Sequence, residues 1–272
     1  MTYQFVDVRK MPKSGGAPST LAQTASMFAV NIVAPGNGVV VWSAAACALP
    51  CDYPGAGREQ AVYTLDPAAP HGYRMIAGAP GGSQVAASAT TVFSRRLNGV
   101  TGKWDMSACA IDGSGCTAIM SEASPAAALY ADGGRFFWIR EGPEGAQLFW
   151  NQAVAPYVPG GSMPFVPSAV ALRVDGDAIA VRSGPEIWTG TLGGTMTRVK
   201  TAAWGGDIDI SHGRIYWNQV PFGQFEGCLG TARLDGTDAR CLEQGQHLDG
   251  TVRVDENYVW FIRDGQVARF LR

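Results

Sequence analysis

The sequence lacks an excess of charge of either sign, and it lacks long apolar runs. Its 272 residues carry a formal net charge of −2, and charged residues make up 16% of the chain. That balance gives no electrostatic reason to expect nucleic acid or an anionic membrane as a partner. No apolar run reaches the roughly 20 residues of a membrane-spanning helix, and the first residues, MTYQFVDVRKMPKSGG, contain no signal-peptide core. We expect no nucleic-acid partner and no insertion into a membrane.

Helical periodicity and familiar catalytic motifs are missing as well. No segment long enough for a helix combines a 3.6-residue apolar period with a cap, so we expect helices to be minor. The phosphate-loop spacing G-x4-G-K-[ST] and the nucleophile elbow G-x-S-x-G do not occur, and the chain has only three histidines. These absences remove the usual sequence evidence for a nucleotide-binding enzyme or a serine hydrolase.

Short apolar runs separated by turns are abundant. Glycine occurs 35 times and proline 16 times, and 46% of the residues are hydrophobic, which is enough for a large core. A turn, a β-branched or aromatic run and a polar exit recur in PGNGVVVWS, SATTVFSRR, ADGGRFFWIR, VDGDAIAVRS, SHGRIYWNQ and VDENYVWFIR. The anchors of these repeats, at separations of 51, 45, 43, 36 and 43 residues, are Trp42, Phe93, Trp138, Val181, Trp217 and Trp260.

Each repeat offers four short strands. One apolar strand precedes the turn, and two more follow the polar exit, as in EIWTGTL and TMTRVKTA. Four strands in about 40 to 45 residues are typical of one blade of a β-propeller. The sequence therefore predicts an all-β fold, a six-bladed β-propeller with four antiparallel strands per blade, although five or seven blades also fit. We expect a single domain over residues 1–272, with blades at about 26–80, 81–123, 124–166, 167–205, 206–247 and 248–272.

The last repeat has only three strands. NYVWFIRDGQVARFLR predicts a hairpin with a type I′ turn at Asp264-Gly265. A strand from residues 1–25 is expected to supply the fourth strand and close the ring, because an unpaired edge strand invites aggregation. Either YQFVDVRKM or PSTLAQTA could do so, and VRKMPKSGGAPSTLAQ also has the pattern of an outer hairpin of a blade.

This VYW-like repeat, with its glycine-rich turns and its LDG and IDG hairpins, resembles the secreted bacterial β-propeller repeat proteins of the six-bladed, TolB-like and NHL-like group. The resemblance covers roughly residues 26–272 and is carried by structural motifs. It implies a propeller fold and a location outside the cytoplasm, and it brings no catalytic motif with it.

Six cysteines occur as three near pairs, which predict the disulfides Cys47–Cys51, Cys109–Cys116 and Cys228–Cys241. The turn Asp112-Gly113 lies midway between Cys109 and Cys116, so the two residues should face each other across a hairpin. The turn Asp235-Gly236 lies about one position from the midpoint of the third pair, a displacement that a β-bulge could absorb.

Three disulfides would indicate an oxidising compartment. We therefore expect an extracytoplasmic protein, secreted, periplasmic or at the cell surface, whose leader is absent from the sequence. Zinc binding is the alternative, but only Cys47 and Cys51 approach the spacing of a zinc site, and no second pair is evident in the sequence.

The loops between the second and third strands of the repeats are very unequal. SAAACALPCDYPGAGREQ, RRLNGVTGK and NQVPFGQFEG are long, whereas SGP and RDG are short. Long, uneven loops on a rigid scaffold are a common place for binding. Arginines and polar groups near this face could bind an anionic or sugar-like ligand by hydrogen bonds and stacking. The ligand-binding residues predicted there are Arg95, Arg140, Arg182, Trp204, Asp207, Asn218, Gln219 and Arg263. The alternative is that these are ordinary solvated rim residues.

Three functions fit this pattern. The first is a recognition module that binds a small polar or anionic ligand, a glycan or a protein partner on the loop-rich face. The second is a lyase or hydrolase at the mouth of the central channel, with His247 and Asp249 as an acid–base pair and Arg140 as an electrostatic stabiliser. The third is a structural part of a larger assembly.

We expect no cofactor and no obligatory metal. Asp207 and Asp249 could each offer a carboxylate to a cation in the channel, but Ser83, Ser124 and Ser168 at the corresponding positions of other repeats are poor partners.

Overall fold

The computed structural model describes residues 6–10, 17, 19–24, 26–36, 39–46, 59–70, 72–76, 85–98, 100–122, 126–132, 134–142, 145–152, 159–165, 169–201, 206–219, 226–246, 248–263 and 266–272. The regular structure within these residues is entirely β-strand. The chain forms two compact units. Unit 1 comprises Met1–Pro125, Gly134–Phe136 and Gln152–Tyr157, and unit 2 comprises Ala126–Gly133, Phe137–Asn151 and Val158–Arg272.

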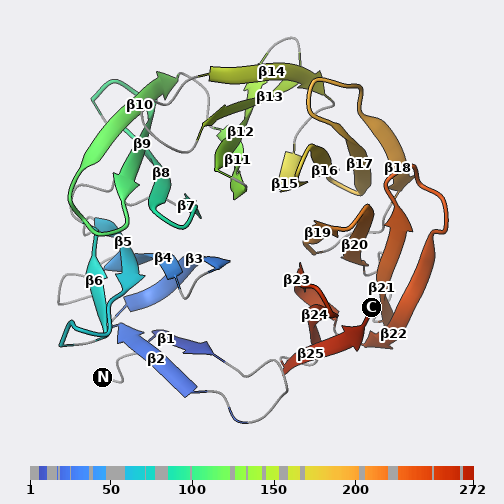
Figure 1. Ribbon diagram of the computed structural model, residues 1–272, viewed down its shortest axis with the longest axis horizontal. Helices are drawn as coiled ribbons and strands as arrows, with labels where there is room; N and C mark the ends of the chain where they lie inside the picture. Colours follow the sequence, from blue (N-terminus) through green and yellow to red (C-terminus); the bar gives the residue numbers. More distant parts are fainter. Residues whose placement is uncertain are drawn as a thin grey trace. The chain divides into compact units, whose positions relative to one another are not determined.

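Unit 1 contains one hairpin and two four-stranded antiparallel sheets (Figure 1). The hairpin pairs β1 (Val6–Lys10) with β2 (Ser19–Thr24). The first sheet consists of β3 (Ser26–Gly36), β4 (Val39–Ala46), β5 (Glu59–Leu65) and β6 (Tyr73–Met75). The second consists of β7 (Val85–Ala87), β8 (Thr91–Leu97), β9 (Trp104–Ala110) and β10 (Cys116–Glu122).

Unit 2 contains two complete four-stranded sheets, one three-stranded sheet and most of another four-stranded sheet. The shared sheet consists of β11 (Ala126–Asp132), β12 (Arg135–Gly142), β13 (Gly145–Gln152) and β14 (Pro159–Phe165). The next consists of β15 (Ala169–Asp175), β16 (Ala178–Ser183), β17 (Glu186–Thr191) and β18 (Thr197–Thr201). It is followed by β19 (Ile208–Ser211), β20 (Arg214–Gln219), β21 (Glu226–Arg233) and β22 (Arg240–Gln246). The last comprises β23 (Leu248–Val254), β24 (Tyr258–Arg263) and β25 (Gln266–Leu271).

The repeat anchor Trp217 packs against the neighbouring sheet. Each anchor lies on the second strand of its sheet, where alternate side chains point to opposite faces. Trp217, on β20, is 1% exposed and packs in one cluster with Ala180 and Ile187 of the preceding sheet. A Cβ atom on its cross-strand partner Gly230 would lie 2.4 Å from the indole ring, so the ring occupies space that only glycine leaves open. The prediction of an all-β fold built from four-stranded antiparallel sheets is confirmed.

The last sheet has three strands in the described part of the chain. There β25 pairs with β24, and β1 pairs with β2 in the hairpin that the sequence predicted as one alternative. Closure of the ring by a strand from residues 1–25 stays a prediction, as do the count of six blades and the single domain. The turn Asp264-Gly265 lies outside the described residues.

Two predicted disulfides are present. Cys109 and Cys116 face each other directly in the register of β9 and β10, with Cα atoms 4.0 Å apart. Cys228 and Cys241 join β21 and β22 across 5.8 Å between Cα atoms. A register shift at Leu229 and Gly230 supplies the irregularity that the displaced turn required. The pair Cys47 and Cys51 lies outside the described residues.

Candidate functional site

The innermost strands of unit 2 carry a connected group of charged side chains. Strands β11, β15, β19 and β23 lie side by side, each in contact with the next (Figure 1). Arg173 Nη2 on β15 donates to both carboxylate oxygens of Asp207 at 2.8 Å, and Arg253 Nη1 on β23 donates to one of them. Arg173 Nε also lies 3.7 Å from Asp209 Oδ1 on β19. We call these four residues the inner-strand cluster.

The backbone around Asp207 is fixed from two second strands. The carbonyl oxygen of Gly206 accepts a hydrogen bond from Arg182 Nη1 on β16, and the Asp207 N–H donates to Asn218 Oδ1 on β20 at 3.1 Å. Gly206 has a φ of 59°, and a Cβ atom there would lie 1.3 Å from Asn218 Oδ1. Only glycine therefore permits this approach, which presents the Asp207 carboxylate to the two arginines.

The cluster is balanced in charge but uneven in exposure. The side chains of Arg173, Asp207 and Asp209 are 13%, 17% and 11% exposed, whereas that of Arg253 is 49% exposed. Solvent therefore reaches the cluster mainly through Arg253.

The burial of the cluster shifts the pKa values of two of the side chains in and beside it. Burial raises the pKa of Asp209, and the nearby Arg173 guanidinium opposes that rise. Asp209 Oδ2 also accepts a hydrogen bond from the Val254 N–H at 2.8 Å. The ring of Tyr130 on β11 lies 5.5 Å from the Arg173 guanidinium carbon. Burial and the charge of Asp209 raise the pKa of Tyr130, which keeps the phenol neutral.

The structure brings together three of the predicted ligand-binding residues and places a fourth beside them. Asp207 belongs to the inner-strand cluster, and Arg182 and Asn218 hold the backbone next to it. Gln219 follows Asn218 on β20, where its side-chain oxygen accepts a hydrogen bond from Trp217 Nε1 at 3.1 Å.

Three other predicted residues lie in local contacts elsewhere. Arg140 stacks on the Phe149 ring of its own sheet at 4.6 Å, and its Nη2 donates to Gln147 Oε1 at 3.3 Å. Arg263 is paired with Glu243. Arg95 lies on β8 in unit 1.

The remaining predicted positions lie outside the described residues. These positions are Trp204, His247 and the side chain of Asp249. Most of the long loops SAAACALPCDYPGAGREQ and NQVPFGQFEG also lies outside the described residues. The acid–base pair of the alternative enzyme function therefore stays a prediction.

Sequence reasoning missed Arg173, Asp209 and Arg253. A signal was present, because Tyr130, Arg173 and Asp209 each lie eight residues before an anchor, at Trp138, Val181 and Trp217. A charged residue at the centre of an inner apolar strand, as in ALRVD and DIDIS, is costly unless paired. The charged residue in each of these strands therefore predicts a partner of opposite charge on the neighbouring strand.

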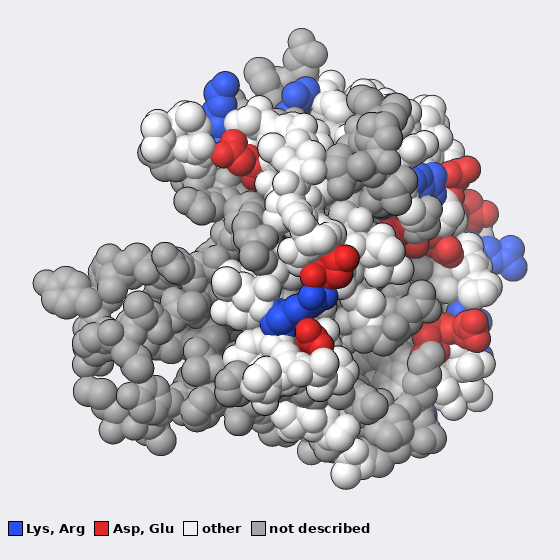
Figure 2. Space-filling view, turned by 60° about the vertical axis from the view of Figure 1, so that its left-hand side comes forward, with Lys and Arg blue, Asp and Glu red and all other residues white. Residues whose placement is uncertain are grey.

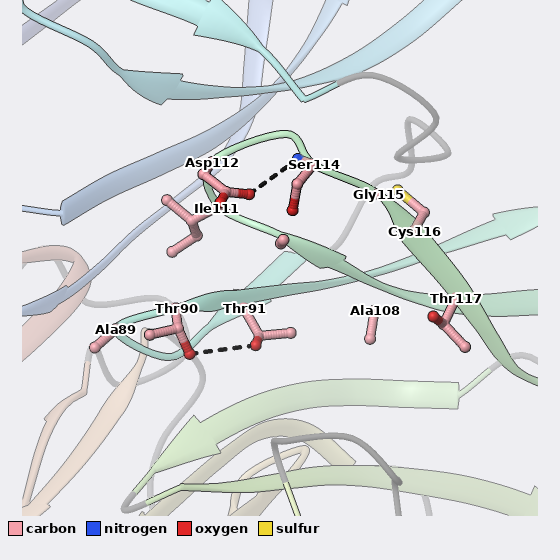
Figure 3. Close-up of a pocket in the computed structure, with 11 residues that line it drawn as sticks. Ala89, Thr90, Thr91, Ala108, Ile111, Asp112, Ser114, Gly115, Cys116 and Thr117 are labelled. Carbon is pink, nitrogen blue, oxygen red and sulfur yellow. Dashed lines mark hydrogen bonds between the residues drawn. The ribbon is translucent and has the colours of Figure 1, made fainter.

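Unit 1 has a different feature, an open pocket of about 650 Å³ on the second sheet (Figure 3). Thr90, Thr91, Ala108 and Thr117 line it beside the turn of the Cys109–Cys116 hairpin. In that turn Asp112 Oδ1 accepts a hydrogen bond from the Ser114 N–H at 2.9 Å. The lining is formed by small residues, and Asp112 is its one ionisable side chain, so the pocket lacks the converging charges of the inner-strand cluster.

Charges on the described surface are mixed. Figure 2 shows basic and acidic side chains interspersed on the visible face, without a large area of one sign. Several are paired, for example Arg214 with Asp238 at 2.8 Å and Arg198 with Glu186 at 3.0 Å. Within the described ranges, no three metal-ligating side chains gather closely enough to hold an ion, and no helix is long and apolar enough to span a membrane.

No protein-family model matches the sequence, and no curated protein is significantly similar to it. Solved structures are similar in fold. The β-propeller domain of the Trilobed protease from Pyrococcus furiosus has a TM-score of 0.65 at 10% identity, over 90% of this chain and 85% of that chain. TolB from Acinetobacter baumannii has a TM-score of 0.56 at 14% identity, over 88% of this chain and 60% of that chain. A chain of the nidogen/laminin complex has a TM-score of 0.56 at 8% identity, over 87% and 86% of the two chains.

These likenesses show that the chain has a β-propeller fold. The expected resemblance to propeller-repeat proteins is confirmed at that level. Membership of the narrower six-bladed secreted group stays a prediction.

Proposed function

We propose that this protein is a non-catalytic, extracytoplasmic recognition module that binds a carboxylate-bearing ligand at the inner-strand cluster. Such a ligand could be an organic acid, a glycan with a uronic acid or an acidic side chain of a protein partner. The observation that carries the proposal is the pairing of one half-exposed arginine, Arg253, with a carboxylate that a second, buried arginine also binds.

This arrangement supports exchange of one carboxylate for another. When Arg253 turns to a ligand, Asp207 keeps its hydrogen bonds to Arg173 Nη2 at 2.8 Å, so no buried charge is left unpaired. Guanidinium–carboxylate hydrogen bonds are among the stronger polar contacts in proteins. Binding through Arg253 would therefore not require the cluster to come apart.

Two observations support an extracytoplasmic location and a non-catalytic role. The disulfides Cys109–Cys116 and Cys228–Cys241 suit an oxidising compartment. The cluster is linked by three ion pairs, Arg173–Asp207, Arg173–Asp209 and Arg253–Asp207, which favours binding over proton transfer.

Isothermal titration tests the ligand site. The probes are citrate, succinate and D-glucuronate at matched ionic strength, with neutral glucose as the uncharged comparison. We expect at least one of the carboxylates to bind, and Arg253→Gln to weaken that binding about tenfold or more, because a charge-assisted hydrogen bond contributes roughly 1.5–3 kcal/mol.

Arg198→Gln is the matched control. Arg198 is similarly exposed, at 56%, and is also paired with a single carboxylate, that of Glu186. Its substitution should leave binding unchanged. Equal binding by wild type and Arg253→Gln, or no carboxylate binding at all, would contradict the proposal.

We further propose that the module has six blades, one for each sheet of three or four strands, and that residues 1–25 cover the free edge of β25. Deletion of residues 1–25 should then speed amide hydrogen exchange in β25 while leaving β20 protected. Unchanged exchange in β25 would argue against closure by this segment.

A further inference from the structure

Arg95 on β8 is a buried arginine whose hydrogen-bonding capacity is unmet. Arg95 is 6% exposed. Its Nε and Nη1 atoms have no hydrogen-bond acceptor among the residues that the structure describes. The face of the guanidinium lies over the Trp104 ring at 4.8 Å. The indole ring attracts the cation but accepts no ordinary hydrogen bond, so Nε and Nη1 stay without an acceptor among the described residues.

The nearest carboxylate along the strand pair does not serve Arg95. Asp105 pairs in register with Arg96, so it lies on the opposite face of the sheet from Arg95. Its two oxygens accept hydrogen bonds from Ser121 Oγ at 2.6 Å and Asn98 Nδ2 at 2.9 Å. Burial lowers the pKa of Arg95, and no neighbouring charge in the described part of the chain offsets that effect.

Two other arginines near the ends of second strands donate hydrogen bonds to acceptors in the protein. Arg140 also stacks on an aromatic ring, that of Phe149, but its Nη2 donates to Gln147 Oε1. Arg182 is 5% exposed and donates from Nε and Nη1 to the carbonyl oxygens of Gly184 and Gly206. Arg95 therefore differs from Arg140 and Arg182 because, among the described residues, no acceptor contacts its Nε or Nη1 atom. An uncompensated buried cation is strongly unfavourable, which points to a counter-ion that the described residues do not supply.

We propose that Arg95 is the anchor of a second binding site, in unit 1, which takes the carboxylate or phosphate group of a small ligand. The oxyanion accepts hydrogen bonds from Nε and Nη1 while the Trp104 ring holds the guanidinium plane. The Phe93–Phe136 ring stack, with centroids 4.2 Å apart, lies next to Arg95 on the same face of the sheet and bounds the site on that side. This site does not depend on the inner-strand cluster.

Thermal unfolding with simple anions tests the site. The probes are sodium acetate, sodium malonate and inorganic phosphate, each compared with sodium chloride at equal ionic strength. To exclude binding at the inner-strand cluster, the measurement uses the Arg253→Gln variant. We expect at least one probe to raise the Tm of this variant by about 2–4 °C near saturation, and the rise to vanish when Arg95→Met is added. A response to phosphate alone, or to the carboxylates alone, would identify the group that the site accepts.

Two control variants separate this site from other cationic positions. Arg140→Met removes a stacked arginine that has a protein acceptor, and Arg198→Gln removes an exposed arginine that is paired with Glu186. Both should keep the anion-dependent rise. In chloride alone Arg95→Met should be at least as stable as the wild type, because the substitution removes an unpaired buried charge.

Arg95→Lys gives a second reading that keeps the charge. A lysine lacks the Nε–H and the planar fork, so the anion-dependent rise should fall to less than half. If Arg95→Met does not fold, this variant decides the outcome. A full rise when Arg95→Met or Arg95→Lys is added to Arg253→Gln, or the lack of any rise in Arg253→Gln alone, would overturn the proposal.

Discussion

Two innermost strands of unit 2 differ from those of unit 1 in the residue type at the same position of the repeat. The position compared is the inner-strand residue that pairs with the residue just before the anchor. In unit 1 it is Val33, which pairs with Val41, and Ala87, which pairs with Val92. In unit 2 the corresponding residues of two consecutive sheets are Arg173, opposite Ala180, and Asp209, opposite Tyr216.

The apolar version shows what the scaffold requires. Val33 and Ala87 pack in one cluster with Val41, Val85 and Val92, and they need no polar partner. Charges at the same position are therefore not demanded by the β-propeller fold. Arg173 and Asp209 must be paired to be tolerated there, so the inner-strand cluster is an addition to what the scaffold requires.

The largest expected effect comes from introducing the unit 1 chemistry at a single position of unit 2. Asp209→Val removes a carboxylate that is 11% exposed, lies 3.7 Å from Arg173 and accepts the Val254 N–H. We expect a loss of about 3 kcal/mol in the free energy of unfolding, because breaking a buried pair leaves uncompensated polar groups. Urea unfolding measures it. Glu256→Val, at an exposed turn residue, should change stability by less than about 0.5 kcal/mol, and equal losses would contradict the pairing.

Removal of a disulfide should have an equal or slightly smaller effect, and one that differs between the units. Cys109–Cys116 in unit 1 spans a sequence separation of 7, and Cys228–Cys241 in unit 2 spans 13. Loop-closure entropy gives about 2.5 kcal/mol for the shorter loop and about 3 kcal/mol for the longer one. Thermal unfolding of the two paired Cys→Ser variants checks this order. A larger loss for the unit 1 pair would show that contacts within the hairpin, not chain entropy, dominate.

The comparison becomes sharper when both charges are replaced together. The double variant Arg173→Leu with Asp209→Val gives unit 2 an apolar pair like that of unit 1. Its loss of stability should differ from the sum of the two single losses by about 0.5 kcal/mol or more, because Arg173 Nε lies 3.7 Å from Asp209 Oδ1. A double-mutant cycle from urea unfolding measures the coupling. Additive losses would show that Arg173 and Asp209 do not interact.

The smallest expected effect is a difference in pH dependence. Burial raises the pKa of Asp209, so its contribution to stability is fully present below about pH 4 and is lost as the pH rises through the folded-state pKa. In unit 1, hydrogen bonds from Ser114 lower the pKa of Asp112. Its contribution is present above about pH 4 and is lost as the pH falls through the folded-state pKa.

Tm values from pH 3 to 7 test these opposite signs. In the wild type, Asp209 lowers the Tm as the pH rises from about 4, and Asp209→Asn should abolish that part of the pH dependence. Asp112 lowers the Tm as the pH falls below about 4, and Asp112→Asn should abolish that part. Changes of the same sign in the two variants would contradict the assignment of one or both pKa shifts.

Local signals in the sequence predicted the repeated architecture. Anchors such as Trp217 recur at a nearly constant spacing, and the turn Asp112-Gly113 places Cys109 opposite Cys116 without any long-range information. The second strands and two disulfides followed from signals of this kind.

The inner-strand cluster could not be predicted in the same way. Arg173 and Asp207 are 34 residues apart, and Asp207 and Arg253 are 46 apart. Their contact depends on which inner strands are neighbours and on the approach of Gly206 to Asn218. Asp207 was predicted because it precedes a strand, whereas its two arginine partners lie within strands that have the pattern of ordinary core.

The free edge of the last sheet has a consequence for handling the protein. In the described part of the chain β25 offers one unpaired backbone edge, and its Val267 and Leu271 side chains are 56% and 67% exposed. Edges of this kind can join another sheet, so concentrated stocks of protein truncated before residue 26 should form oligomers through β25. A lysine in place of Val267 should keep such preparations monodisperse and suitable for crystallisation.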